Sequence, residues 1–294
     1  MNELPTFTFQ FHITDECDQR CRHCYLFAEG HPDLVTMPFG EMVRVVDSCA
    51  AMCGELGRAP YFYLTGGDPV LHPDFWRLAE FLHARGYKWC VLGNPFHLTA
   101  EVCARLAELG CRKYQLSIDG LRETHDRMRM PGSFDATLAA IPLIQSAGMW
   151  ANVMTTVSSA NAAGCHTEFQ LKDHLWKLLL WEQGRWEVPQ GADPKLIYDG
   201  CHCGIAHMTV LPTGDVFACR RMESKVGNVF ERSAKNIFLG EAMEAHREFG
   251  KFEKCRDCEL WGWCRGCPAV AAGYTGDMYA PDPQCWHEVG KGVA

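Results

Sequence analysis

The sequence predicts an α/β fold: a parallel sheet that forms a full or partial (β/α) barrel, followed by a smaller region that depends on metal. In the first half of the chain, five β-rich runs alternate with helical patterns. Strands that alternate with helices form parallel sheets with right-handed crossovers. From about residue 200 the strands are short, the turns carry Gly and Pro, and cysteines recur every few residues. Such a region has little apolar core, so bound metal must supply much of its folding energy.

The strands and helices of the first half have recognisable limits. The expected strands cover residues 7–14, 61–65, 88–93, 113–118 and 150–157. A helix expected over 72–86 has Pro73 in its first turn, where a missing N–H costs little. Thr99 is expected to cap the next helix and Ser133 a third, because a hydroxyl at the N-cap accepts a bond from the first turn. The functional loops of a barrel lie at the carboxyl ends of its strands.

Charge and hydropathy exclude several classes of partner. The formal net charge is −8, which leaves no basic surface for nucleic acid and disfavours an anionic membrane. The N-terminus has no basic segment followed by an apolar core, so we expect no signal peptide. Residues 136–167 carry no charge, but they are too polar for a membrane span. We therefore expect a cytoplasmic protein without nucleic-acid or membrane partners.

Cysteine is the unusual residue of this chain, which has 17 of them. Cys17, Cys21 and Cys24 form a C-x3-C-x2-C motif directly after the first expected strand. Three thiolates suit an iron–sulfur cube in which one iron has no protein ligand, and that iron can bind a substrate or cofactor. The alternative is a structural zinc site completed by His12 or His23. It is less favoured, because structural zinc sites close four protein ligands around the metal.

The C-x3-C-x2-C motif, with an aromatic residue at Tyr25, resembles the signature of the radical S-adenosylmethionine (radical SAM) superfamily. A second segment, residues 65–69, reads Thr-Gly-Gly-Asp-Pro and is similar to the Gly-Gly-Glu-Pro motif of that superfamily. Glycines let a backbone approach a ligand closely, so its carbonyls can accept from the methionyl ammonium. The resemblance covers roughly residues 7–161. It implies that the following residues bind the cofactor: Tyr25, Gly66, Gly67, Asp68, Pro69, Asn94, Ser117, Asp119 and Arg129.

The C-terminal cysteines resemble the SPASM extension of radical SAM enzymes, which holds two auxiliary [4Fe–4S] clusters. The resemblance assigns the distal cluster to Cys255, Cys258, Cys264 and Cys285. It assigns the proximal cluster to Cys201, Cys219 and Cys267, with Cys203 as the fourth ligand or as a bystander. The family usually has three residues between the last two cysteines of the motif, where this chain has two. The expected cofactors are thus S-adenosylmethionine and three [4Fe–4S] clusters, and two structural zinc sites are the alternative for this region.

Three regions follow from the resemblance. We expect a radical SAM partial barrel over 1–161, a bridging helical segment over 162–199, and a SPASM domain over 200–294. The family pattern continues after the fifth strand with a helix and a sixth strand, and roughly one such β/α unit is missing here. Either the barrel is open and five-stranded, or the numbering joins segments across a gap.

The resemblance also implies the chemistry. One electron from the reduced cluster breaks a carbon–sulfur bond of S-adenosylmethionine, and the resulting 5′-deoxyadenosyl radical takes a hydrogen atom from an unreactive C–H bond. The leading hypothesis is an oxidoreductase that matures a ribosomally synthesised peptide, by thioether formation, carbon–carbon crosslinking or epimerisation. With 16 residues before Cys17, we expect no leader-binding domain. The peptide would then be held by the barrel and SPASM surfaces or delivered by a separate protein. Flavodoxin or ferredoxin is the expected electron donor.

Two other hypotheses remain open at this point. The first is a radical SAM/SPASM enzyme that acts on a small molecule, such as a haem precursor or an aminoglycoside. The second is an iron–sulfur electron carrier, which the intact cysteine triad argues against, because a carrier needs no open iron. Sulfatase-maturing relatives have an Asp after the cysteine that is Cys219 here. This chain has Arg220 and Arg221 instead, which argues against that activity.

Overall fold

The computed structural model describes residues 4–24, 26–27, 33–156, 175–193 and 196–290. The chain divides into two compact units. The barrel unit comprises residues 1–167, 208–216 and 227–237, and the cysteine-rich unit comprises residues 168–207, 217–226 and 238–294. The chain therefore leaves the barrel unit and returns to it twice before its end.

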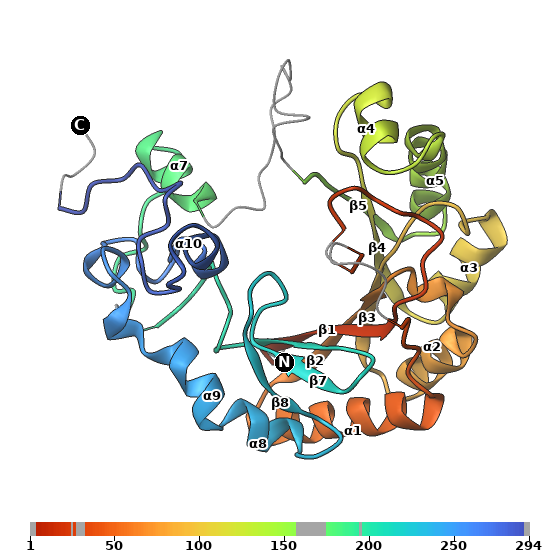
Figure 1. Ribbon diagram of the computed structural model, residues 1–294, viewed down its shortest axis with the longest axis horizontal. Coiled ribbons are helices and arrows are strands. Elements are labelled where there is room, and N and C mark those ends of the chain that lie inside the picture. Colours follow the sequence, from red (N-terminus) through yellow and green to blue (C-terminus); the bar gives the residue numbers. More distant parts are fainter. Residues whose placement is uncertain (1–3, 25, 28–32, 157–174, 194–195, 291–294) are drawn as a thin grey trace. The chain divides into compact units, whose positions relative to one another are not determined.

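The barrel unit is built on a parallel sheet (Figure 1). Its parallel strands are β1 (Thr6–Thr14), β2 (Ala59–Gly66), β3 (Lys88–Leu92), β4 (Cys111–Ser117) and β5 (Trp150–Met154). Three short strands continue the sheet beside β1: β6 (His207–Val210), β7 (Asp215–Phe217) and β8 (Lys225–Asn228). The sheet order is β5-β4-β3-β2-β1-β6-β7-β8, with the first and last strands unpaired to each other among the described residues. The predicted fold class, a mostly parallel α/β sheet that does not close, is confirmed, with five parallel strands among the described residues.

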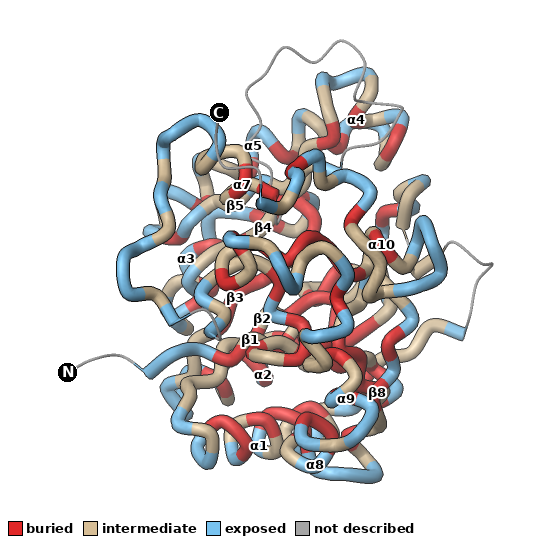
Figure 2. The backbone as a smooth tube through the Cα atoms, turned by 90° about the vertical axis from the view of Figure 1, so that its left-hand side faces the viewer, coloured by how far each residue is buried: buried red, intermediate tan, exposed pale blue. Residues whose placement is uncertain are grey.

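Helices cover the outer side of the parallel strands (Figure 1). They are α1 (Phe39–Glu55), α2 (Phe75–Ala84), α3 (Ala100–Glu108), α4 (Arg122–Met128) and α5 (Ser133–Ser146), with a 3-10 turn η1 (Pro69–Leu71) after β2. Buried positions recur along α1 with exposed ones between them, as an amphipathic helix requires (Figure 2). Cys49 and Cys53 are among its fully buried residues, so they are core residues, as expected. Thr99 caps α3 as predicted, since its Oγ1 accepts from the backbone N–H of Val102 at 3.2 Å.

The predicted cap of the third helix is wrong. Ser133 is the first residue of α5, and Gly132 before it has a left-handed backbone with φ of 81°. The carboxylate of Asp126 accepts from the N–H groups of Gly132 and Phe134, at 2.9 and 2.8 Å. The Asp126 carboxylate thus binds the N–H groups at the start of α5. The Oγ of Ser133 forms a hydrogen bond with Nε2 of His125 instead, at 2.6 Å.

The described helices of the C-terminal half are all short. They are α7 (Trp176–Glu182), α8 (Ala234–Phe238), α9 (Glu241–Glu244), η2 (Ala245–Arg247), η3 (Phe249–Lys251), η4 (Cys255–Asp257) and α10 (Pro268–Thr275). One small apolar cluster of the cysteine-rich unit is formed by Leu175, Leu178, Leu260 and Cys264, with Cys258 and Cys285 packed against it. Cysteines are thus part of the core itself, which fits a unit stabilised by metal.

Two expectations concern segments that the structure describes only in part. The segment after β5, where a further β/α unit would lie, falls on residues 157–174, outside the described residues. Within the bridging helical segment expected over 162–199, the described residues contain α7 (Trp176–Glu182). Among the described helices, none has the length and apolar character that crossing a lipid bilayer requires.

Candidate functional site

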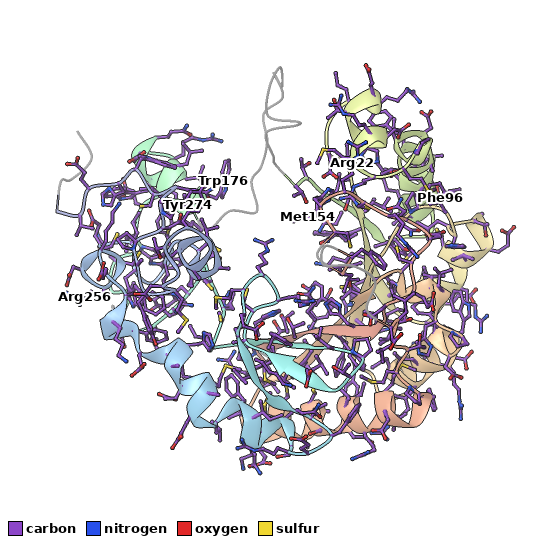
Figure 3. All side chains as sticks on the ribbon, in the orientation of Figure 1. Arg22, Phe96, Met154, Trp176, Arg256 and Tyr274 are labelled. Atoms are coloured by element: carbon purple, nitrogen blue, oxygen red, sulfur yellow. The ribbon has the colours of Figure 1, made fainter. Side chains whose placement is uncertain are left out.

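The loop that follows β1 carries the first three cysteines. Cys17, Cys21 and Cys24 are all partly buried (Figure 3, where Arg22 marks the loop). A turn brings two of them together, since the N–H of Cys24 donates to the carbonyl of Cys21 at 3.0 Å. The N–H of Arg22 donates to the carbonyl of Met128 at 2.8 Å and so fastens the loop to the end of α4. The loop lies at the carboxyl end of β1, as the barrel topology predicts.

Two of the predicted cofactor-binding residues point N–H donors at these thiols. The side-chain amide of Asn94, after β3, lies 3.8 Å from the sulfur of Cys17. The guanidinium of Arg129, after α4, lies 3.7 Å from the sulfur of Cys21. Burial raises the pKa of the Cys17 thiol to about 12, so deprotonation there needs a positive partner. Donors aimed at sulfur favour a metal-bound thiolate and tune the metal that it holds.

Asp119 acts on this site through Arg129. Its carboxylate is fully buried and accepts from the Nε of Arg129 at 2.5 Å and from the N–H of Thr156 at 2.9 Å. The ring of His23 lies 3.7 Å from the same carboxylate. Burial lowers the pKa of His23, and the charge of Asp119 partly opposes that shift. Asp119 therefore holds Arg129 and the loop in place.

A second carboxyl group of this site belongs to Asp68, directly after β2 and Gly67. It is fully buried, and one oxygen accepts from the N–H of Val70 at 3.4 Å. Burial raises the pKa of Asp68 to about 7, and the nearby His97 partly offsets the rise. His97 also lies 2.8 Å from the carboxylate of Asp18, which follows the first motif cysteine. A cation bound beside Asp68 would stabilise the ionised carboxylate.

Several buried polar atoms around the three cysteines have no hydrogen-bond partner among the described residues. They are Nε2 of Gln19, Nδ1 of His23, Oδ2 of Asp68 and Oδ1 of Asn94. Buried polar atoms are nearly always bonded in native proteins, so a group of unbonded ones indicates a polar ligand. Three thiols with donors and acceptors left open around them fit an iron–sulfur cube together with a charged, polar cofactor.

Sequence reasoning did not single out three residues of this site: Asp18, Gln19 and His97. The first two stand inside the cysteine motif itself, so their spacing was visible in the sequence. His97 lies three residues after Asn94 in the loop before α3, but only the fold shows that it reaches Asp18.

The backbone around the two glycines of the predicted cofactor motif leaves no room for a side chain. Gly66 has φ of 132°, and a Cβ there would lie 2.0 Å from the carbonyl oxygen of Thr14. A Cβ on Gly67 would lie 2.1 Å from the carbonyl oxygen of Glu16. The N–H groups of Gly67 and Asp68 donate to those same two carbonyls, at 2.8 and 2.7 Å. These contacts join the end of β2 to the backbone directly before Cys17, so the glycines shape the cysteine loop.

The other predicted cofactor residues have simpler positions. Pro69 opens η1 and is buried. Ser117 is the last residue of β4 and is partly buried, so it lies at the same end of the sheet as the cysteine loop. Tyr25 lies outside the described residues.

Four C-terminal cysteines line one pocket of the cysteine-rich unit. They are the four assigned by resemblance to the distal cluster: Cys255, Cys258, Cys264 and Cys285. Burial raises the pKa of Cys264 to about 12 and that of Cys255 to about 11, and the charges of the neighbouring thiolates add to both shifts. Four neighbouring cysteines resist becoming thiolates together because the negative charges would repel one another. A metal cluster overcomes this repulsion, since it binds the thiolates and releases the protons of the thiols.

The other four cysteines of this unit also lie together. The raised pKa of Cys203 has its first cause in a hydrogen bond with Cys201, followed by burial and by the charges of Cys201 and Cys219. Burial raises the pKa of Cys219, and the charges of Cys201 and Cys267 add to that shift. These interactions group Cys203 with the three predicted proximal ligands. Its sulfur also lies 3.8 Å from Nδ1 of His246.

Comparison with known proteins shows the family of this chain. Residues 11–159 match the radical SAM superfamily. The chain belongs to that superfamily. Residues 201–268 match SPASM, an iron–sulfur cluster-binding domain. Both the resemblance and the fold class predicted from the sequence are confirmed. The protein is a radical SAM enzyme with a C-terminal SPASM domain, which implies S-adenosylmethionine and iron–sulfur clusters as cofactors.

Its relatives include enzymes with different substrates. An AdoMet-dependent heme synthase from Methanosarcina barkeri is 25% identical over 341 residues, with 95% of this chain and 96% of the relative covered. The mycofactocin maturase MftC of Mycobacterium ulcerans is 28% identical over 329 residues, with 93% of this chain and 86% of the relative covered. Among solved structures, Streptococcus suis SuiB bound to S-adenosylmethionine has a TM-score of 0.63 at 15% identity, covering 96% of this chain and 78% of SuiB. That likeness concerns the fold alone.

Proposed function

We propose that this radical SAM enzyme modifies a ribosomally synthesised peptide, by forming a thioether or carbon–carbon crosslink or by epimerising a residue. The observation that carries the radical chemistry is the three-cysteine loop with unbonded polar atoms around it. The peptide substrate is supported by the 28% identity to the maturase MftC across 93% of this chain. A solved complex of SuiB with its precursor peptide SuiA also has this fold, with a TM-score of 0.64 at 14% identity.

Each part of the barrel site has a task in this proposal. Cys17, Cys21 and Cys24 hold the first [4Fe–4S] cluster and leave one iron open, and Asn94 and Arg129 donate to their sulfurs. Asp68 accepts from the ammonium group of S-adenosylmethionine through the oxygen that is otherwise unbonded. When bound together, the cluster and the cofactor supply a 5′-deoxyadenosyl radical for hydrogen abstraction. Other residues proposed to touch the cofactor are Tyr25, Gly66, Gly67, Pro69 and Ser117, with Asp119 acting through Arg129.

We assign the two auxiliary clusters to the two sets of C-terminal cysteines. Cys255, Cys258, Cys264 and Cys285 hold the distal cluster. Cys201, Cys203, Cys219 and Cys267 hold the proximal one, with Cys203 as its fourth ligand. Both clusters are then fully ligated by protein and serve to carry electrons, while substrate chemistry stays at the open barrel site.

The proposal extends to partners and compartment. We propose a cytoplasmic enzyme that takes its electrons from a flavodoxin or ferredoxin. A separate leader-binding protein is proposed to deliver the peptide. Thiolate clusters with an open iron suit a reducing compartment, where thiols stay reduced.

A second candidate function is modification of a tetrapyrrole. It is favoured by one specific observation: the heme synthase from Methanosarcina barkeri aligns with 95% of this chain. The same three cluster sites would serve either substrate, so the distinction rests on the substrate that is turned over.

Mass spectrometry of the products separates the two functions. Anaerobically reconstituted enzyme is incubated with reductant, S-adenosylmethionine and either synthetic Cys- or Gly-rich peptides or Fe-coproporphyrin III. A peptide lighter by two hydrogens supports crosslinking, and deuterium uptake at one α-carbon without other mass change supports epimerisation. The variant Cys17→Ala, Cys21→Ala, Cys24→Ala is the control and should leave every substrate unchanged. Turnover of the tetrapyrrole with all peptides unchanged would replace the first proposal by the second.

A further inference from the structure

One buried charge of the cysteine-rich unit has no assigned role. Arg265 stands between Cys264, of the distal set, and Cys267, of the proximal set. It is only 4% exposed. Its Nε and one terminal nitrogen, Nη2, are buried without a hydrogen-bond partner among the described residues. A buried guanidinium with unbonded donors is costly, so its position requires a compensating negative group.

Two aromatic rings hold the guanidinium in place. Its central carbon lies 5.1 Å from the ring centre of Phe249 and 5.5 Å from that of Trp261. The two rings pack edge to face against each other, with their centres 5.4 Å apart. Cation–π contacts of this kind stabilise the charge from the faces of the rings. They leave the N–H groups, which point out along the edge of the guanidinium, free to donate elsewhere.

Arg265 lies on the short chain segment that joins the two cysteine sets. Cys264 of the distal set directly precedes it, and Gly266 alone separates it from Cys267 of the proximal set. A single cation therefore lies within electrostatic reach of both sets.

We propose that Arg265 is shared by the two auxiliary clusters: its guanidinium donates hydrogen bonds to sulfur atoms of both and stabilises their reduced states. The inference rests on the proposed pair of auxiliary clusters. A cube held by four thiolates has a net negative charge that grows on reduction, so a buried cation beside it favours the reduced form. Hydrogen bonds to the sulfurs raise the potential in the same direction. Arg265 thus raises the reduction potentials of both clusters and so favours electron transfer to them.

The test measures the reduction potentials of the auxiliary clusters. Full-length protein carrying Cys17→Ala, Cys21→Ala and Cys24→Ala is reconstituted anaerobically, so that only the two auxiliary clusters contribute. Potentials are read by electron paramagnetic resonance during redox titration. With Arg265→Gln, the reduction equilibrium constant of both clusters should fall roughly tenfold or more, which is about 59 mV for a one-electron couple. Arg265→Lys, which keeps the charge but loses the planar fork, should show a smaller fall in both.

The matched control is Arg256→Gln. Arg256 is next to Cys255, but its side chain is 50% exposed, and Figure 3 shows it at the outer edge of the cysteine-rich unit. Solvent screens such a charge, so both potentials should stay unchanged. If Arg265→Gln loses iron, a fall of both potentials in Arg265→Lys still supports the proposal.

Two results would overturn the shared role of Arg265. The first is unchanged potentials in both Arg265 variants, and the second is a fall confined to one cluster. Parent protein with fewer than two auxiliary clusters would contradict the proposed cofactor content itself. Iron content and spectra of the parent protein, recorded before any titration, separate that outcome from the other two.

Discussion

The two cysteine regions differ in how many thiols each gathers and in what surrounds them. The barrel loop gathers three thiols, and the atoms around it include unbonded amide, imidazole and carboxylate groups. The cysteine-rich unit gathers two sets of four, and the distal set packs against leucine and tryptophan side chains. A [4Fe–4S] cluster held by three thiolates keeps one iron open to a ligand, whereas a cluster held by four thiolates has no open iron. The same metal chemistry can thus serve reaction in one region and stability with electron transfer in the other.

The difference also concerns folding. The barrel unit has a core of its own, with fully buried Phe7, Phe9, Phe11 and Trp89. The cysteine-rich unit has a small core in which cysteines take part. Removal of metal should therefore affect the second unit far more than the first.

The largest expected effect comes from the distal set. Cys255→Ala with Cys258→Ala should remove about four irons, the content of one cube. The cysteine-rich unit should then become sensitive to proteolysis, because it loses the metal that stabilises it. Iron analysis and limited proteolysis with mass mapping measure both effects.

The control for this pair is Cys49→Ala with Cys53→Ala, which removes two buried cysteines from α1 of the barrel unit. Those thiols fill core space, so iron content should stay the same. Equal iron in the two double variants would contradict the assignment of the distal cluster.

A smaller effect is expected at the glycines that shape the barrel loop. In Gly67→Ala, the new methyl group would lie 2.1 Å from the carbonyl of Glu16, so the backbone before Cys17 must move. We expect a lower iron content of the first cluster and weaker binding of S-adenosylmethionine, measured by iron analysis and calorimetry. Gly54→Ala is the control, since nothing lies within 4 Å of its added Cβ. If Gly67→Ala keeps its iron and loses only cofactor affinity, then the glycine serves the ligand and not the loop.

The smallest expected effect concerns the ion pair behind the loop. Arg129→Met leaves the fully buried carboxylate of Asp119 without its cation, which should lower the free energy of unfolding by about 3–5 kcal/mol. The exposed pair of Arg105 and Glu80 provides the comparison, and Arg105→Met should cost about 0–1 kcal/mol. Denaturant titration of both iron-free variants measures the difference. Similar losses in the two variants would show that Arg129 does not hold a buried charge in place.

Local patterns were sufficient to predict most of the fold. Strands and helices alternate along the barrel unit, and each element can be recognised from a few neighbouring residues. Three members of the distal set lie within ten residues of one another, and the family resemblance adds Cys285 to them. By contrast, the proximal set joins Cys201 to Cys267 across a long stretch of chain, so no local pattern predicts that they belong together and only the family resemblance does.

What the sequence could not predict depends on neighbours that are distant along the chain. Position 67 requires glycine because a Cβ there would lie 2.1 Å from the carbonyl oxygen of Glu16, in the loop after β1. The cap of α5 comes from Asp126, so the hydroxyl expected to cap it has a different partner. The burial of Arg265 against two aromatic rings requires the folded unit.

The contrast between one open site and two closed ones is tested most directly by cofactor cleavage and iron content together. Protein purified anaerobically should hold about twelve irons, four in each of three cubes, and should release 5′-deoxyadenosine when reduced with S-adenosylmethionine. The variant Cys17→Ala, Cys21→Ala, Cys24→Ala should keep about eight irons and release none. Release of 5′-deoxyadenosine by that variant, measured by liquid chromatography and mass spectrometry, would contradict the assignment of the open site to the barrel loop.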